Sequence, residues 1–247
     1  MIKLKSKEEI EKMREAGVIL ANCHKEIEKR IRPGVTTLEI DQFVEQYLAS
    51  HGATPEQKGY KGFPFATCSS VNEVICHGFP ANSPLQEGDI VTIDIVVNKN
   101  GWLADSAWTY AVGNISSEAL HLMNVTKKSL YLGIEKAVIG NRIGDISHAI
   151  QSYAEADGLS VVRQFVGHGI GRKLHEDPKV PHFGSPNQGI VLKEGMVITI
   201  EPMITRGSVF AYITEDGWTA KTVDHSLAAQ YEHTIAITKQ GPYILTE

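Results

Sequence analysis

The chain has 247 residues, a length that fits one large domain or two small ones. Hydrophobic residues make up 42% of it and charged residues 21%, as is typical of a soluble globular protein. The net charge of −5 comes without a long basic run, so we expect no nucleic-acid partner.

The cysteines and the N-terminal segment bear on the compartment. Cys23, Cys68 and Cys76 are an odd number without paired spacing, which argues against a disulfide framework and favours a reducing compartment. The first five residues lead directly into a charged segment, so no signal peptide is expected, and no apolar run is long enough to span a bilayer. We therefore expect a cytoplasmic protein with no membrane partner.

Two helices are predicted at the start of the chain. The first covers residues 6–31 and opens with a capping box, formed by Ser6 and by Glu9 three residues later. A second capping box, formed by Thr36 and Glu39, opens another helix. Both helices carry apolar residues at helical spacing, so each is expected to pack one face on a core.

A β-hairpin is predicted around the dipeptide Asn100-Gly101, which marks a tight turn after the β-branched run 91–97. Asp94 and Asp105 lie in its otherwise apolar strands, where strand propensity disfavours them. A two-residue loop would set Asp94 diagonal to Asp105, and a four-residue loop would set the two directly opposite. Both registers bring the two carboxylates to one face of the hairpin.

Two interpretations of this aspartate pair stay open at this point. Like charges on one buried face repel each other and lose hydration, and a bound cation is the simplest compensation. Alternatively, because Ile93, Ile95 and Val97 fill the opposite face, the aspartate face could be the solvated side of an edge hairpin.

The rest of the chain mixes helices with short strands. A helix is predicted from Ser116 or Ser117 to about Gly140, and another from Asp145 to near Gly158. Irregular segments are predicted at 53–68 and 172–189, and strands at 159–166, 190–204, 210–213 and 233–238. Without a regular βαβ alternation, this order predicts an α+β fold in which helices back a curved antiparallel sheet.

The chain also repeats itself at an offset of 107 residues. The run from Leu85 to Asp94 aligns with the run from Leu192 to Glu201, and the acid recurs in the same apolar context. Face-to-face packing of a duplicated unit would bring Asp94 and Glu201 to one central site. We therefore expect a single domain, residues 1–247, built from two pseudo-twofold halves, approximately 1–110 and 111–247.

Acids and histidines mark a candidate metal site. Four acids lie inside or beside predicted strands: Asp94, Asp105, Glu201 and Glu232. Three histidines lie beside glycines or in loops: His77, His168 and His175. Several carboxylates with one or two imidazoles suit a divalent metal such as Mn, Fe, Co or Zn, and four acids favour two bridged ions. Such a pair generates hydroxide from water and polarises a carbonyl, which leads to amide or ester hydrolysis.

These motifs form a specific combination along the chain. They are His77-Gly78, two aspartates eleven residues apart, Gly167-His168-Gly169-Ile170-Gly171, His175, Thr199-Ile200-Glu201-Pro202 and Tyr231-Glu232-His233-Thr234. Over essentially the whole chain, the combination resembles the type I methionine aminopeptidases. That family has a duplicated pita-bread fold. The resemblance implies removal of the N-terminal methionine from nascent proteins and short peptides whose next residue is small, by attack of a metal-held hydroxide on the first peptide bond.

The resemblance also implies a ligand set for two divalent ions, which would be Co, Mn, Fe or Zn. Asp105 and Glu232 would bridge the two ions. Asp94 would complete the coordination of one ion, and His168 with Glu201 that of the other. The free amine of the substrate would bind the ion that carries Asp94.

Further roles follow from the same resemblance. Glu201 would accept the proton of the attacking water, His175 would stabilise the tetrahedral intermediate, and His77 would contact the scissile amide. A narrow apolar pocket for the methionine side chain would be lined by Tyr60, Phe63, Cys68 and Trp218. Two positions depart from the family pattern, since Leu174 stands where an aromatic residue is expected and Phe63 where Tyr is common.

Other classes of protein share parts of this pattern. An X-Pro aminopeptidase or prolidase would have the same fold and ligands, but usually an additional N-terminal domain, for which we expect no room. Type II methionine aminopeptidases carry an insertion between the ligand histidine and the next glutamate, whereas His168 and Glu201 are only 33 residues apart. A non-catalytic pita-bread binding protein should have lost ligands, and all five are present. A single self-contained pocket favours a monomer.

Overall fold

The computed structural model describes residues 2–247. Its first two helices, α1 (Lys7–Glu28) and α2 (Thr37–Ser50), begin at the predicted capping boxes. In each box the cap hydroxyl accepts a hydrogen bond from the glutamate N–H, and the glutamate carboxylate accepts one from the cap N–H. Helix α1 ends three residues earlier than predicted, because the chain turns before Pro33 and a residue that precedes proline disfavours helical backbone.

The central hairpin consists of β4 (Ile90–Lys99) and β5 (Trp102–Ala111), joined by the two-residue turn Asn100-Gly101. Both turn residues have positive φ, 54° and 76°, as this turn type requires. Val96 pairs with Asp105, so Asp94 lies on the diagonal. Of the two registers left open by the sequence, the two-residue loop is therefore correct.

Short strands surround this hairpin in the first half of the chain. They are β1 (Thr54–Pro55), β2 (Cys68–Val71) and β3 (Val74–Cys76), with the 3-10 turn η1 (Tyr60–Gly62) between β1 and β2. The hairpin sheet runs β1-β4-β2, with β5 on the other side of β4. Every pairing in it is antiparallel.

The second half begins with helices α3 (Ser117–Glu135) and α4 (Ile143–Ala156). Its strands are β6 (Ser160–Val161), β7 (Gly167–Gly169), β8 (Glu176–Val180), β9 (Val197–Ile200), β10 (Met203–Thr205), β11 (Ala211–Ile213), β12 (Ala220–Thr222), β13 (Ala228–Gln230), β14 (His233–Thr238) and β15 (Gly241–Ile244). The main sheet of this half runs β15-β14-β9-β7-β8, and two smaller sheets run β13-β10-β6 and β11-β12-β3. All these pairings are antiparallel as well.

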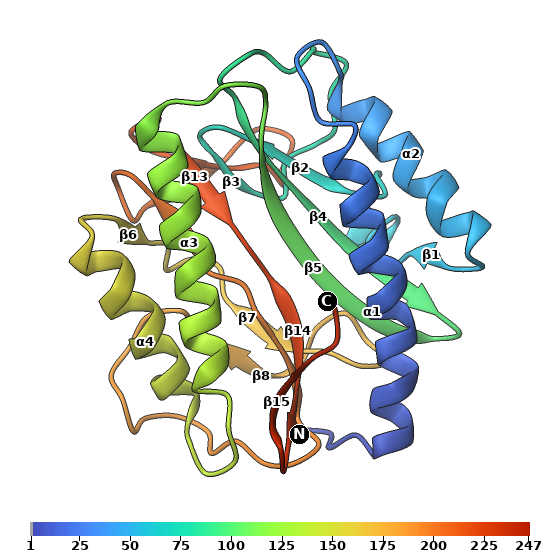
Figure 1. Cartoon of the computed structure of the whole chain (residues 1–247), viewed down its shortest axis with the longest axis vertical. Helices are drawn as coiled ribbons and strands as arrows, with labels where there is room; N and C mark the ends of the chain where they lie inside the picture. The colour runs from blue at the N-terminus through green and yellow to red at the C-terminus, as the bar shows by residue number, and fades with distance from the viewer. Residues whose placement is uncertain (1) are drawn as a thin grey trace.

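Each half has its own core, and the helices lie on one side of the strands (Figure 1). Alternate residues of β4, from Val91 to Val97, pack against α1 and α2 in one buried cluster. Isoleucines of β9 and β14 pack against α3 and α4 in another. Because side chains alternate along a strand, the β4 residues between these apolar ones, including Asp94, face away from the helices. This confirms the predicted α+β arrangement of helices backing antiparallel sheets.

Matching contacts occur at the start of α2 and of α4. The N–H of Gly34 donates to the carbonyl of Leu85 at 2.8 Å, and that of Gly140 donates to the carbonyl of Leu192 at 3.1 Å. Leu85 and Leu192 are separated by the repeat offset of 107 residues, and Gly34 and Gly140 by 106, nearly the same offset. They support the division into two related halves, which stands as our proposal.

Several predicted boundaries in the second half are wrong. Helix α4 begins at Ile143, because the carboxylate of Asp145 reaches back to the N–H of Arg142 from inside the first turn. Helix α3 ends at Glu135, short of the predicted Gly140. Strand β8 lies in a segment predicted as irregular, and its Pro178 is tolerated because β8 is an edge strand.

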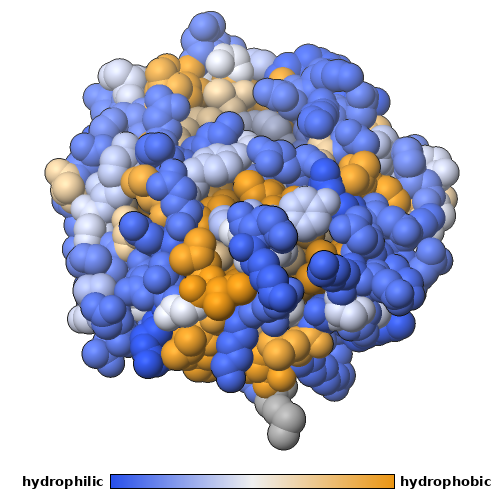
Figure 2. Space-filling model, turned by 60° about the horizontal axis from the view of Figure 1, so that its bottom comes forward, coloured by the Kyte–Doolittle hydropathy of each residue, from blue (hydrophilic) through white to orange (hydrophobic). Residues whose placement is uncertain are grey.

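The molecular surface is mostly hydrophilic on the face shown in Figure 2, with patches of apolar side chains. The protein exposes some large apolar side chains, among them Leu4, Ile139 and Ile190. Such exposure is ordinary on protein surfaces. Between residues 2 and 247, none of the helices combines the length and the apolar character needed to cross a membrane.

Candidate metal centre

A cavity of about 320 Å³ opens on the side of the central strands that faces away from the helices. Its lining includes every side chain predicted for the site: Tyr60, Phe63, Cys68, His77, Asp94, Asp105, His168, His175, Glu201, Trp218 and Glu232. These residues are far apart in the sequence, and the fold brings their side chains together around one cavity.

Five separate positions in the sheets supply the candidate ligands. Asp94 and Asp105 lie within β4 and β5, and His168 is the central residue of β7. Glu201 directly follows β9, and Glu232 lies between β13 and β14. Placement in or beside strands fixes the backbone of each ligand, which is what a precise site requires.

The two halves meet at a seam beside these ligands. The N–H of Glu232 donates to the carbonyl of Ala107 at 2.9 Å. The hydroxyl of Thr234 accepts from the N–H of Asp105 at 3.0 Å and donates to the carbonyl of the same residue at 2.8 Å. This seam holds Asp105 of the first half beside Glu232 of the second.

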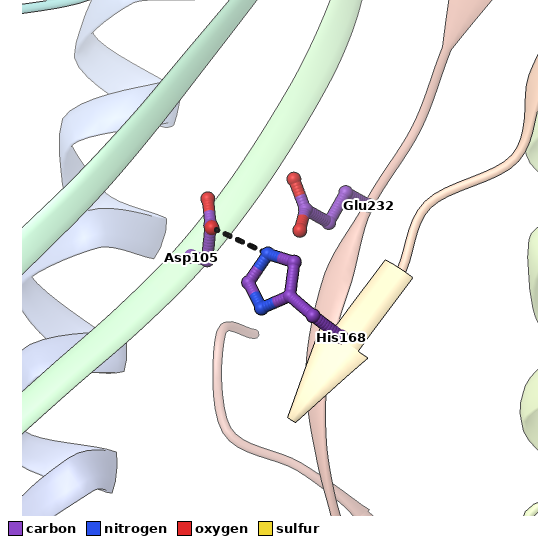
Figure 3. A group of neighbouring side chains, drawn as sticks. All are labelled: Asp105, His168 and Glu232. Carbon is purple, nitrogen blue, oxygen red and sulfur yellow. Dashed lines mark ion pairs between the residues drawn. The ribbon is translucent and has the colours of Figure 1, made fainter. Parts of the chain in front are cut away.

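The ligand atoms converge on a small volume. One potential metal-ligand atom from each of Asp105, His168 and Glu232 lies within 4.8 Å of the other two. The three side chains point toward a common centre (Figure 3). His168 Nε2 is 3.7 Å from Asp105 Oδ2 and 3.7 Å from Glu201 Oε1. These separations are long for hydrogen bonds, but they suit atoms that each lie about 2 Å from a shared cation.

Unsatisfied oxygens test whether a metal fits. Asp105 Oδ1 and Glu232 Oε1 are buried and have no hydrogen-bond partner in the described part of the chain. Buried polar atoms are costly unless something pairs with them, and carboxylate oxygens are good ligands for divalent cations. The residues therefore fit a divalent metal.

Neighbouring groups orient the ligands. His168 Nδ1 lies 3.0 Å from the carbonyl of Gly169, so this nitrogen carries the proton and Nε2 is free to bind a metal. The Thr199 hydroxyl donates to Glu201 Oε1 at 2.7 Å and accepts from the N–H of His168 at 2.9 Å. Gln230 Nε2 donates to the other oxygen of Glu201 at 3.4 Å. Both oxygens of Glu201 are thus held.

Burial controls the protonation of the ligands in the protein without metal. It raises the pKa of Asp94, Asp105, Glu201 and Glu232, and the mutual repulsion of these carboxylates raises the pKa of all but Asp94 further. Burial and the charge of His175 lower the pKa of His168 to about 4, so its imidazole is neutral at neutral pH. A cation would replace the protons on the acids, and a neutral imidazole is ready to bind it.

The other two histidines stand beside the ligand cluster. The rings of His175 and His168 are 4.3 Å apart, and the Tyr60 hydroxyl lies 3.0 Å from His175 Nδ1. His77 has a positive φ of 57°, unusual for a residue with a side chain, and its ring stands edge-on to Phe165. Burial lowers the pKa of His77 to about 4. Both histidines can therefore act as neutral hydrogen-bonding groups at the cavity wall.

The apolar part of the cavity is built from aromatic rings and a thiol. Phe63 and Trp218 pack edge to face with centroids 5.1 Å apart, and Cys68 pairs in register with Asp94. Leu174, which departs from the family pattern, also lines the cavity. Burial raises the pKa of the Cys68 thiol well above its usual value, so the thiol stays protonated. Cys68 therefore lines the pocket and is a poor nucleophile.

Sequence reasoning missed two glutamines that support the ligands. Gln57 is buried, and its amide donates to the carbonyl of Asp94 at 2.9 Å while its oxygen accepts from the N–H of Val96. Gln230 contacts Glu201, as described above. A glutamine in a loop carries no signal of such a role, and Gln230 is marked only by its place two residues before Glu232.

This chain belongs to metallopeptidase family M24, whose model matches residues 11–239. It is 52% identical over 246 residues to the methionine aminopeptidase of Clostridium perfringens, covering 100% of this chain and 99% of that protein. It superimposes on the crystal structure of methionine aminopeptidase from Rickettsia prowazekii with a TM-score of 0.99 and 43% identity, covering 100% of both chains. The prolidase of Pyrococcus furiosus matches with a TM-score of 0.79 and 25% identity, covering 99% of this chain and 65% of that one.

These matches confirm the predicted pita-bread fold and the class of a metal-dependent peptidase. Together with the buried Asp-His-Glu cluster, they indicate that the protein binds divalent metal.

Proposed function

We propose that this protein is a methionine aminopeptidase, which removes the N-terminal methionine of nascent proteins and peptides when the next residue is small. The observation that carries the proposal is one cavity that joins a buried carboxylate-imidazole cluster to an aromatic pocket. Full-length similarity to methionine aminopeptidases, against a partial match to a prolidase, favours methionine over proline-directed hydrolysis.

Two divalent ions, Co, Mn, Fe or Zn, are proposed to bind at the cluster. Asp105 and Glu232, whose unpaired oxygens lie at the seam of the two halves, would be shared ligands of both ions. Asp94 would hold one ion, and His168 with Glu201 would hold the other. When bound, such ions supply a hydroxide nucleophile at neutral pH and polarise the scissile carbonyl.

The chain's own side chains move the proton and stabilise the charge. Glu201 accepts the proton of the attacking water, and its orientation is held by Thr199 and Gln230. His175 donates a hydrogen bond to the developing oxyanion, with its other nitrogen held by Tyr60. His77, which lines the same cavity, contacts the scissile amide.

The apolar pocket is proposed to take the methionine side chain. Phe63 and Trp218 form an edge-to-face wall, and Tyr60 and Cys68 line the same cavity. An unbranched thioether adapts to such a slot and makes favourable contacts with aromatic edges. The free amine of the substrate binds on the side of Asp94, which restricts cleavage to the first peptide bond.

We also propose that the protein acts as a monomer in the cytoplasm. All eleven site residues come from one chain, so the cavity needs no partner subunit. The three cysteines are free, as a reducing compartment favours. Sedimentation at micromolar concentration tests the oligomeric state, and a dimer would contradict it.

One assay tests the proposed reaction. The purified protein is incubated with Met-Ala-Ser, Leu-Ala-Ser and Ala-Pro peptides in the presence of Mn²⁺ or Co²⁺. Release of free methionine alone is expected. Cleavage only before proline would assign a prolidase-like activity instead, and no cleavage with either metal would favour a non-catalytic binding protein.

A further inference from the structure

A buried ion pair lies outside the metal cluster. Lys5 Nζ is 2.7 Å from Glu176 Oε2, and the two side chains are only 5% and 7% exposed. By contrast, the side chains of the ion pair between Lys221 and Glu73 are each about one-third exposed. Burying two charges costs desolvation energy that their attraction often fails to recover. Stability alone therefore gives little reason for this pair to be buried.

Glu176 uses its second oxygen to close a loop. Oε1 accepts hydrogen bonds from the N–H groups of Arg172 at 3.2 Å and Lys173 at 3.4 Å. The loop, residues 170–175, joins β7 to β8, and its last residue is His175. The carboxylate of Glu176 thus folds back on the loop that presents this histidine.

Lys5 is itself fixed on the body of the protein. Its N–H donates to the carbonyl of Gly195 at 2.7 Å. Its side chain crosses the loop at Gly171, where a Cβ would lie 2.6 Å from Lys5 Cε and 3.0 Å from Glu176 Oε1. The lysine stem and the carboxylate therefore pack directly on the loop backbone, and a side chain at position 171 would push them away.

The carboxylate of Glu176 is kept ionised. Burial alone would raise the pKa of Glu176, but its bond to Lys5 and the N–H of Lys173 hold that pKa below its usual value. The ionised carboxylate makes stronger hydrogen bonds to the loop N–H groups than a neutral acid would. By pairing with Glu176, Lys5 therefore strengthens the hydrogen bonds that hold the loop.

We propose that Lys5 and Glu176 are positioning residues, which hold the 170–175 loop so that His175 faces the reacting carbonyl. The N-terminal segment thereby completes the active site. This inference rests on the proposed function, in which His175 stabilises the developing oxyanion. The Tyr60 hydroxyl holds the imidazole at Nδ1, and the ion pair holds the backbone behind it. A displacement of about 1 Å at such a group can cost about a hundredfold in rate.

The central variant is Lys5→Met, which keeps an unbranched apolar stem and removes the charge. With Met-Ala-Ser and saturating Mn²⁺, kcat should fall about tenfold or more while KM changes less than about threefold. The metal content of the purified protein should not change. Lys5→Arg should restore kcat to within about threefold of the wild type, because a cation again reaches Glu176. Unchanged kcat in Lys5→Met would overturn the proposal.

Arg14→Met is the matched structural control. Arg14 Nη1 donates to the carbonyls of Leu245 and Glu247 at 2.7 Å each, so it ties the N-terminal helix to the body without touching the loop. Arg14→Met should lower the Tm and leave kcat unchanged. If Lys5→Met fails to fold, the double variant Lys5→Met/Glu176→Gln leaves no unpaired buried charge and should still show the loss of kcat. A wild-type kcat in that double variant would also contradict the role.

A double-mutant cycle with His175→Ala separates the two proposals. Lys5→Met should lower kcat in the wild type but have little further effect in the His175→Ala background, since both changes remove the same contribution. Additive losses would assign Lys5 a general structural role. If His175→Ala itself retains wild-type kcat, the role given to His175 under the proposed function is wrong, whatever Lys5→Met does.

Discussion

The two halves of the molecule supply the metal cluster in different ways. Asp94 and Asp105 come from one hairpin, whose two-residue turn fixes their diagonal placement locally. His168, Glu201 and Glu232 come from three separate positions that only the assembled sheet brings together. The first half therefore offers a local platform, whereas the second half depends on long-range packing.

The support around the ligands differs as well. In the second half, Glu201 has a hydrogen-bond donor on each carboxylate oxygen, from Thr199 and Gln230. At the seam, Asp105 Oδ1 and Glu232 Oε1 have none within residues 2–247. The oxygens that lack protein donors are those proposed to bridge the metals. Glu201 is proposed both as a ligand and as the proton acceptor, and its two protein donors orient its carboxylate even without metal.

Substitution of Glu201 is expected to have the largest effect on turnover and tests its proposed role as the base. Glu201→Ala should nearly abolish turnover, with a loss of about a thousandfold or more, because both a ligand and the proposed proton acceptor disappear. The measurement is kcat on Met-Ala-Ser, with circular dichroism to show that the fold persists. Activity within about tenfold of the wild type, about 1.4 kcal/mol of barrier, would show that Glu201 is not the base.

Removal of the metal should change how stability depends on pH. In the metal-free protein, burial raises the pKa of Asp94 and Glu201, so the folded state holds protons that the unfolded state has lost. The free energy of unfolding of the metal-free protein should therefore fall as pH rises from about 4, where an ordinary carboxyl group titrates, through neutrality. Each pH unit costs up to about 1.4 kcal/mol per carboxyl.

Urea denaturation across this pH range, with chelator or with excess Mn²⁺, gives the comparison. The metal-loaded protein should lack the decline, because the cation replaces the protons and binding releases them to solvent. Parallel curves with and without metal would contradict the assignment of these carboxylates as ligands.

The histidines on the substrate side should behave unlike the ligands. His77→Ala and His175→Ala should each lower kcat about a hundredfold, as expected when one oxyanion or amide contact is lost. Neither should reduce bound metal, since both stand beside the cluster rather than in it. Elemental analysis of the purified variants is the check. Loss of metal in either variant would move that histidine into the ligand set.

The same contrast explains what the sequence could reveal. The hairpin and the capped helices were predictable because turn and capping signals are local, as at Asn100-Gly101 and Ser6. The site residues could be named because acids in apolar strands are rare and the family motifs are specific. Strand β8 was not predictable, since it contains Pro178 and forms only by pairing with β7. The support from Gln57 and Gln230 also depends on tertiary contacts.

These two glutamines give the smallest and sharpest test of the comparison between the halves. Gln57 contacts the backbone on either side of Ile95, at Asp94 and Val96, whereas Gln230 contacts the carboxylate of Glu201. Gln57→Ala would leave a buried carbonyl and N–H unpaired, and should lower the free energy of unfolding by about 1–3 kcal/mol. Because the hairpin register is fixed by its own turn, kcat should change little.

Gln230→Ala should show the reverse pattern. Its bond to Glu201 is long, at 3.4 Å, so its loss should cost little stability, but it frees one oxygen of the proposed base and should lower kcat severalfold. Urea denaturation and kcat measured on both variants complete the comparison. If Gln57→Ala impairs kcat as much as Gln230→Ala does, the hairpin is not a self-sufficient platform, and Asp94 depends on tertiary support as the ligands of the second half do.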